Sequence, residues 1–136
     1  MKVLSVRQPW AWAIFHGGKD IENRTWSTHY RGPLAIHASS VRTPQKYWVE
    51  LQDKKCRVPD KDELPTSVIL GVVDLVDVVE KSRSRWHMDG CYGFVFRNPR
   101  LLVKPLRAHG WLNLWEPRPA HKRILMSLAG QRKRRG

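Results

Sequence analysis

Four charged side chains crowd the stretch "GGKDIENRTW", residues 17–26, which lies between two tryptophan-containing segments. They are Lys19, Asp20, Glu22 and Arg24. Because side chains alternate between the two faces of a strand, Asp20, Glu22 and Arg24 are expected on one face and Lys19 on the other. Glu22 and Arg24 can then form a surface ion pair contributing about 0–1 kcal/mol, or line a cavity where their charges grip a ligand. Both interpretations stay open at this point.

The segment "RQPW", residues 7–10, lies between an expected strand and an expected helix, where rigid elements commonly hold ligand-binding loops. Arg7 has a forked set of donors and Gln8 an amide, and both groups suit phosphates or base edges. Trp10 and Trp26 can stack on a base, a contact contributing about 1–3 kcal/mol. The alternative is that both tryptophans belong to the core.

Three further titratable residues are candidates for the same site. His37 ends an apolar strand, as either a buried or rim residue or a member of a cavity. Asp74 and Asp77 lie three apart on one expected strand and therefore on opposite faces, so at least one points inward or at a rim. A buried carboxylate must be paired or have a raised pKa. Its candidate partners are Lys19, Arg7 and Arg24.

The polar segment 81–90 mixes cations with an aromatic residue. Such a mixture suits single-stranded nucleic acid, in which phosphates meet cations and bases stack on aromatic rings. It is also common in exposed loops. Trp86 is surrounded there by Lys81, Arg83, Arg85 and His87.

The elements that position these residues follow from hydrophobic periodicity and turn residues. The segment 67–80 is the clearest strand because it is rich in β-branched residues, and Gly71 within it predicts a bend or a close backbone approach. "RNPR", residues 97–100, is expected to be a turn that separates a strand over 91–96 from a strand over 101–110. The remaining strands are expected at 2–6, 19–26, 34–37 and 111–115, and helices at 9–16, 43–54 and 118–129.

The later strands follow one another without intervening helices. This order favours an α+β fold with a small, mixed, mostly antiparallel β-barrel and about three helices packed outside it. The 136-residue length fits one domain, expected at residues 1–130, followed by a basic disordered tail at 131–136.

The net charge is +13. Seven Lys/Arg and no acidic residue lie in 118–136, so residues 1–117 still carry +6. A basic body with a basic tail favours a polyanionic partner, and nucleic acid is the commonest soluble one. General solubility is the alternative explanation.

Several classes of site and location are not indicated. Cys56 and Cys91 lie far apart without metal-like spacing, so we expect free thiols, no bound metal and no cofactor; only a nuclease reaction would call for a divalent metal. Phosphate-binding loops, dinucleotide-binding glycines and hydrolase elbows are missing from the sequence. The chain has no run of 18 apolar residues and begins without a signal-like segment, which predicts no membrane contact and a cytoplasmic monomer.

The order of four segments resembles the ASCH (activating-signal-cointegrator homology) domain, a family of the PUA-like superfamily. They are "LSVRQPWAWAIFHGGKDIENRTW", "YRGPLAIHAS", "LPTSVILGVVDLVDV" and "GCYGFVFRNPRLL", and the resemblance covers about residues 3–115. It implies a five- or six-stranded barrel with a cleft lined by residues 7–10 and 19–24. It also implies RNA or DNA binding, in some relatives with a flipped or modified base in an aromatic pocket.

The resemblance also implies two enzymatic alternatives. Some ASCH proteins are amidohydrolases that act on an N4-acylated cytidine through a Lys, a Thr three residues later and a Glu. Lys19 matches the lysine and Asp74 lies near the carboxylate, but Glu22 stands where the threonine nucleophile is needed. Ribonuclease activity is also associated with the family; there Lys19 would stabilise a developing oxyanion, with Glu22 or His37 as base.

We therefore expect a nucleic-acid-binding domain, most plausibly for single-stranded RNA, with a basic cleft and a base-sized pocket. Its alternatives are a small hydrolase acting on RNA or on a modified nucleoside, and a protein-interaction module in transcription or translation control. The expected binding residues are Arg7, Gln8, Trp10, Lys19, Arg24, Trp26, His37, Arg83, Arg85 and Trp86, and the candidate catalytic residues are Lys19, Glu22 and Asp74.

Overall fold

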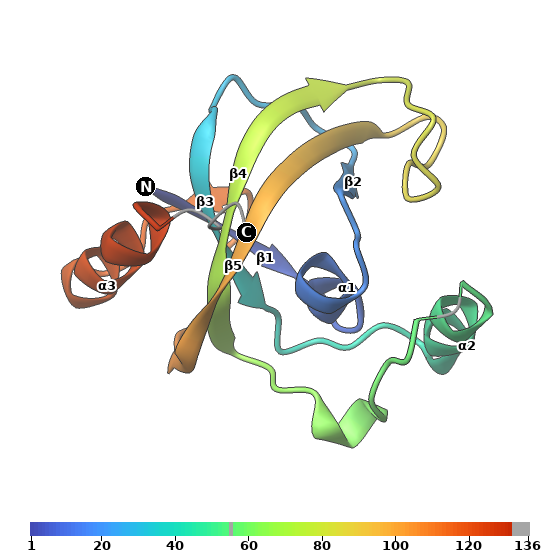
Figure 1. Ribbon diagram of the computed structural model, residues 1–136, viewed down its shortest axis with the longest axis horizontal. Helices are drawn as coiled ribbons and strands as arrows, with labels where there is room; N and C mark the ends of the chain where they lie inside the picture. The colour runs from blue at the N-terminus through green and yellow to red at the C-terminus, as the bar shows by residue number, and fades with distance from the viewer. Residues whose placement is uncertain (55, 132–136) are drawn as a thin grey trace.

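Six strands form one curled sheet in the order β2-β5-β4-β3-β1-β6 in the computed structural model, which describes residues 1–54 and 56–131 (Figure 1). β1 and β3 run parallel, and the other neighbouring pairs are antiparallel. The predicted mixed, mostly antiparallel sheet is therefore confirmed. The strands are β1 (Lys2–Val6), β2 (Ile21–Arg24), β3 (Gly32–Ala38), β4 (Val68–Val79), β5 (Tyr92–Arg107) and β6 (Leu114–Trp115).

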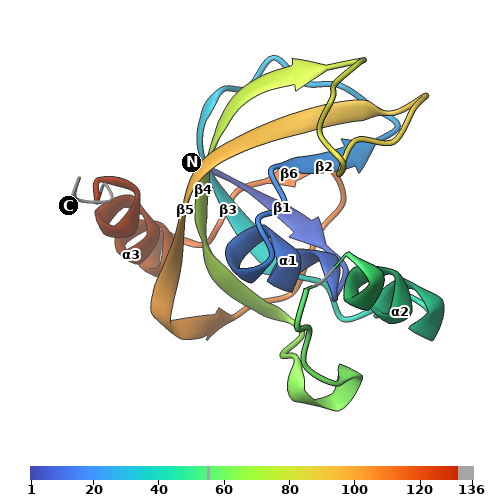
Figure 2. The same ribbon diagram turned by 45° about the vertical axis from the view of Figure 1, so that its right-hand side comes forward.

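Helices cover both sides of this sheet (Figure 2). α1 (Trp10–His16) packs Ala11 and Ile14 on one side. α3 (Pro119–Ala129) packs Leu125 on the other side, against a cluster that includes Val72. Alternation along the strands supplies both cores, because successive side chains point to opposite faces. None of the helices in the described residues combines the length and hydropathy needed to cross a membrane.

α2 (Gln45–Asp53) lies beyond the end of α1, away from the main sheet core. Its Trp48 and Leu51 pack against Ile21 of β2 and Trp86 of the β4–β5 loop. The short helix η1 (Lys61–Glu63) follows in the connection to β4. This second apolar cluster ties α2, β2 and the β4–β5 loop together, and these three elements form one wall of the site described below.

The "RNPR" segment does not form the predicted turn, because β5 continues through it as a single strand of 16 residues. β4 pairs with β5 on both sides of the segment, and the register shifts between Val72 and Asp74 absorb an irregularity there. Asn98 takes a left-handed φ of 54°, a conformation that asparagine tolerates better than most residues. The strand therefore bends at Asn98 where the sequence pattern predicted a reversal.

Gly71 confirms the predicted close backbone approach. A Cβ at this position would lie 2.1 Å from the carbonyl oxygen of Arg100 and 2.9 Å from the ring of Phe15. No side chain fits there, since β5 crosses β4 at the point where α1 packs on the sheet. The glycine thus allows the tight curvature that encloses the core.

The tail predicted at 131–136 falls almost entirely outside the described residues, so its predicted disorder stays a prediction.

Candidate functional site

A cleft of about 1190 Å³ opens between α2, the β4–β5 loop, β2 and the segment before β6. Among its lining residues, Lys and Arg outnumber carboxylates by six to two. Charged groups in a cleft act on a ligand more strongly than on an open surface, because the low-dielectric walls focus their field. The cations are Arg7, Lys19, Arg24, Lys46, Lys54 and Arg85, and the carboxylates are Glu22 and Glu50.

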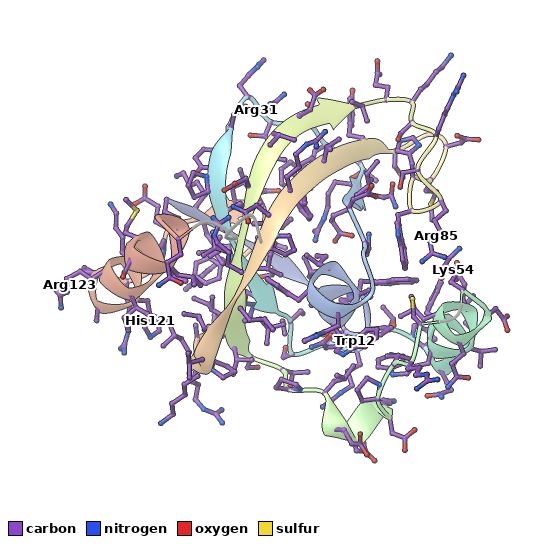
Figure 3. All side chains as sticks on the ribbon, viewed as in Figure 1. Trp12, Arg31, Lys54, Arg85, His121 and Arg123 are labelled. Atoms are coloured by element: carbon purple, nitrogen blue, oxygen red, sulfur yellow. The ribbon has the colours of Figure 1, made fainter. Side chains whose placement is uncertain are left out.

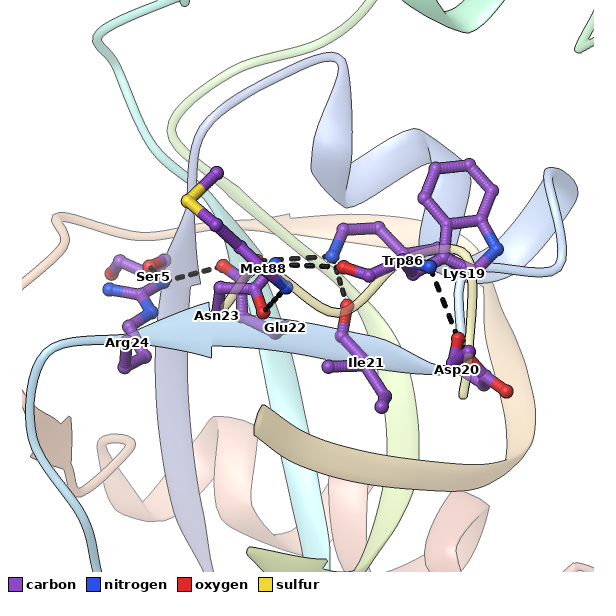
Figure 4. A network of polar contacts seen from close by, with 10 residues as sticks. Ser5, Lys19, Asp20, Ile21, Glu22, Asn23, Arg24, Trp86 and Met88 are labelled. Atoms are coloured by element: carbon purple, nitrogen blue, oxygen red, sulfur yellow. Dashed lines mark hydrogen bonds and ion pairs between the residues drawn. The ribbon is translucent and has the colours of Figure 1, made fainter. Parts of the chain in front are cut away.

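A chain of ion pairs forms the floor of the cleft (Figure 4). The Lys19 ammonium lies 3.3 Å from one carboxylate oxygen of Glu22 and also donates to the Ile21 carbonyl. The other carboxylate oxygen of Glu22 accepts a 2.9 Å hydrogen bond from Arg24. Arg24 also donates to the Ser5 carbonyl at 2.7 Å, which links the chain to β1. Glu22 is therefore shared by two cations.

Lys19 does not point away from Glu22, as strict alternation over 19–26 predicted. β2 begins only at Ile21, and Gly18 before it has a φ of 70° that turns the chain. The Lys19 side chain thus lies outside the strand pattern and reaches back over β2. Asp20 leaves the cleft floor instead and accepts a 2.6 Å hydrogen bond from the Ser84 hydroxyl.

Burial controls the charges on this floor. Lys19 is 4% exposed and Glu22 is 8% exposed, so the interpretation as an exposed surface ion pair does not hold. Burial lowers the pKa of the Lys19 ammonium, although Glu22 opposes this effect. Burial also acts to raise the pKa of Glu22, but the charges of Lys19 and Arg24 together hold it below its ordinary value. The carboxylate is therefore ionised at neutral pH.

Trp86 gathers cations on the wall opposite the floor. The Arg85 guanidinium lies 4.9 Å from the Trp86 ring centroid, and the ammonium groups of Lys19 and Lys54 each lie 5.8 Å from it. Arg85 also donates a 3.2 Å hydrogen bond to the Lys54 carbonyl, and the two side chains meet at the end of α2 in Figure 3. Cation–π attraction therefore fixes three positive charges around one indole.

Since cations cover Trp86, the aromatic faces that are more open to the cleft belong to half-buried residues. Trp10 packs edge to face with Tyr47 at 5.7 Å between ring centroids, and Trp26 packs similarly on Phe94 at 5.2 Å. All three cleft-lining rings, Trp10, Tyr47 and Trp26, keep part of their surface accessible.

Asn23 holds the β4–β5 loop against β2. Its amide donates a 2.8 Å hydrogen bond to the Trp86 carbonyl and accepts a 2.9 Å bond from the Met88 amide. The side chain that alternation directs away from Glu22 thus anchors the loop that carries Arg85. β2 therefore supplies the floor of the cleft and positions its wall.

His37 lies at the far end of the cleft and is almost fully buried. Its Nε2 donates to the Ala108 carbonyl at 2.7 Å, because a carbonyl can only accept. Its Nδ1 therefore accepts the 3.0 Å hydrogen bond from the Ser5 hydroxyl, and that oxygen accepts a 3.2 Å bond from the Trp115 indole. Burial lowers the pKa of His37, so the neutral ring fits this network.

The structure brings together most of the site residues predicted from the sequence, but three lie elsewhere. Gln8 is fully buried, and its amide bonds the Trp12 amide and the Pro65 carbonyl. Asp74 bonds Arg100 at 3.0 Å on the β4–β5 pair, so it does not join Lys19 and Glu22. Arg83 is exposed and does not line the cleft. Those that do line it are Arg7, Trp10, Lys19, Glu22, Arg24, Trp26, His37, Arg85 and Trp86.

Some lining residues were missed by the sequence analysis. Lys46, Glu50 and Lys54 recur every four residues on one face of α2, and this spacing could have indicated a shared surface. The segment 109–113 carries no comparable periodic signal. Within residues 1–54 and 56–131, no group of three His, Cys, Asp or Glu side chains is arranged to hold a metal ion.

The pattern of the ASCH domain matches residues 4–105, which include every strand except β6 in whole or in large part. The chain belongs to the ASCH domain family. It is 30% identical over 125 aligned positions to activating signal cointegrator 1 of Homo sapiens and to that of Mus musculus. The alignment covers 83% of this chain but only 22% of each relative, so the chain spans about a fifth of their length. The matched ASCH region contains the floor and the cation-bearing wall of the cleft, whereas 109–113, β6 and α3 lie beyond it.

Proposed function

We propose that this ASCH domain binds single-stranded nucleic acid, in the first place RNA, along the cleft, with one base held against its aromatic residues. The observation that carries the proposal is the cation cluster on Trp86 facing the floor of β2. Phosphates would meet Arg85 and Lys54, while a base would stack on Trp10 or Tyr47. The Arg85 guanidinium plane offers a further stacking surface.

The size of the cleft supports a polymer more than a small metabolite. Pockets for small molecules measure about 300–1000 Å³, and this cleft of about 1190 Å³ is larger. The excess of cations over carboxylates agrees with a polyanionic ligand. A single strand also exposes its bases without the few kcal/mol needed to flip one out of a duplex.

Salt dependence of binding tests the electrostatic part. Single-strand affinity falls with salt by a slope of about 0.7 per phosphate contact. We expect the double variant Lys54→Gln/Arg85→Gln to bind a labelled 12-nucleotide RNA more weakly, with the slope reduced by about 1.4, twice that value. The matched control is Lys122→Gln/Arg123→Gln on α3, which removes two charges on the far side of the sheet (Figure 3).

Equal losses in the two double variants would contradict the cleft as the binding site. Deletion of residues 131–136 separates the tail from the cleft, because loss of all binding on deletion would assign the interaction to the tail. An affinity that hardly changes between low and moderate salt would reject the electrostatic argument. Failure of the wild-type protein to bind RNA or DNA at all would favour a protein-interaction module.

A hydrolase is a second candidate because Lys19 and Glu22 meet at 3.3 Å on the cleft floor, with the pKa of Lys19 lowered by burial. A lysine with a lowered pKa beside a carboxylate is a common arrangement in proton transfer. The test is turnover of labelled RNA and of an N4-acylated cytidine by the wild-type protein and by Lys19→Ala. Equal turnover by both proteins would eliminate Lys19 as a catalytic residue.

A further inference from the structure

Two large apolar side chains, Trp111 and Leu112, protrude at the rim of the cleft; we call them the apolar tip. Trp111 is 62% exposed and Leu112 is 88% exposed, and both line the cleft. They belong to the segment that leaves β5 and curves round to β6 (Figure 2). This segment lies outside the residues matched by the ASCH family, so the family match assigns it no role.

The base of the apolar tip is fixed on the sheet. His37 bonds the Ala108 carbonyl just before it, and Trp115 bonds the Ser5 hydroxyl just after it. Between them Gly110 rests on the His37 ring, where a Cβ would come within 2.7 Å of Cε1. The tip therefore projects from an anchored segment, and little ordering of its backbone is needed when a ligand binds.

The surroundings of the apolar tip decide which partner fits it. Single exposed apolar residues are ordinary, but two adjacent ones at the rim of a ligand cleft mark a contact surface. The same cleft carries six Lys and Arg side chains, which would repel or desolvate poorly against an apolar protein surface. A nucleic-acid strand satisfies both features, since its phosphates meet the cations while its bases present flat faces to an indole.

We propose that Trp111, with Leu112 beside it, forms a second stacking subsite that holds a base of the same single strand outside the inner aromatic pocket. The inference rests on the proposed function. It adds a contact that is independent of phosphate charge and tolerant of sequence, because every base has a stacking face. It also predicts that the binding site is longer than the family-matched part of the cleft.

A length series of labelled single-stranded RNAs, from 2 to 12 nucleotides, tests the subsite on the full chain. For the longer RNAs, Trp111→Ala should raise Kd by about 5- to 150-fold, the range that base stacking on an aromatic residue supplies. The salt slope should stay unchanged, because no phosphate contact is lost. For the shortest RNAs, which fill only the inner pocket, the variant should bind like wild type. Trp111→Phe should restore most of the affinity.

Val103→Ala is the matched control, because Val103 is a fully exposed apolar residue on β5 that does not line the cleft. If wild-type RNA binding needs Lys54 and Arg85 but Trp111→Ala binds every RNA like wild type, the subsite is wrong and the proposed function stands. If the wild-type protein binds no RNA, both fail together. If Trp111→Ala changes only the sedimentation coefficient, the apolar tip contacts a second copy of the chain and the subsite is overturned.

Discussion

Replacement of Glu22 by glutamine should destabilise the fold far more than loss of an exposed carboxylate. Glutamine keeps the shape of the side chain but leaves Lys19 and Arg24 facing each other without a counter-charge. Removal of one partner from a buried ion pair costs about 3–5 kcal/mol. The lower end applies here, because the Arg24 side chain is 24% exposed and can be hydrated from the cleft. We therefore expect a loss of about 3 kcal/mol in the free energy of unfolding.

Urea unfolding followed by tryptophan fluorescence measures this loss. With a urea slope of about 1–3 kcal/mol per molar, the midpoint should fall by about 1–3 M at pH 7. The matched control is Glu116→Gln, because Glu116 pairs with Lys2 at 3.3 Å on the surface and its side chain is 77% exposed. That exposed pair should contribute less than about 1 kcal/mol.

The pH dependence of the Glu22→Gln variant gives a second reading of the same argument. Burial already lowers the pKa of Lys19 in the wild-type protein, and loss of the carboxylate removes the strongest influence that opposes it. In the variant the unfolded state then holds the lysine proton at pH values where the folded state has begun to release it. Stability of the variant therefore rises with pH above neutrality, and its deficit against wild type should shrink between pH 7 and pH 9.5.

Two results would refute this reasoning about Glu22. One is an unfolding free energy for Glu22→Gln within about 1 kcal/mol of that for Glu116→Gln at pH 7. The other is a deficit that grows as the pH is raised. The double variant Glu22→Gln/Arg24→Gln should regain part of the loss, because it leaves one buried cation in place of two.

Three further predictions concern packing and acid sensitivity. Gly71→Ala should lower urea stability by at least about 1–3 kcal/mol, because its Cβ would meet the Arg100 carbonyl at 2.1 Å; wild-type stability would show that β5 can move away. Gly110→Ala should destabilise through contact with the His37 ring, and an unchanged urea midpoint would contradict the described fit. Burial lowers the pKa of His37, so stability should fall as the pH drops below about 6.5; His37→Gln should flatten that decline in pH-dependent urea midpoints.

Local rules predicted the parts of the fold that depend on local chemistry. The β-branched run of β4 and the need for glycine at position 71 follow from residue type alone, and both are confirmed. The pairing of Glu22 with Arg24 follows from alternation on one strand. The bend at Asn98 was missed, because continuous pairing of β5 with β4 is decided by contacts distant in sequence.

The misplacement of Lys19 has a different cause. Alternation holds only from the first residue of a strand, and the turn at Gly18 delays the start of β2 to Ile21. The segment 109–113 could not be placed on the cleft from its own residues. Its position is set by the fit of Gly110 on His37, more than 70 positions earlier in the chain. Both failures therefore concern where a local pattern begins or is seated, and the residue types themselves were informative.

The sharing of Glu22 between two cations limits how this site can change during evolution. A hydroxyl residue at position 22, as a lysine–threonine mechanism requires, would leave Lys19 and Arg24 as uncompensated neighbours. The single substitution is therefore blocked unless position 24 loses its charge first or at the same step. Among homologous sequences, residues at positions 22 and 24 should accordingly covary, with threonine at the first accompanied by an uncharged residue at the second.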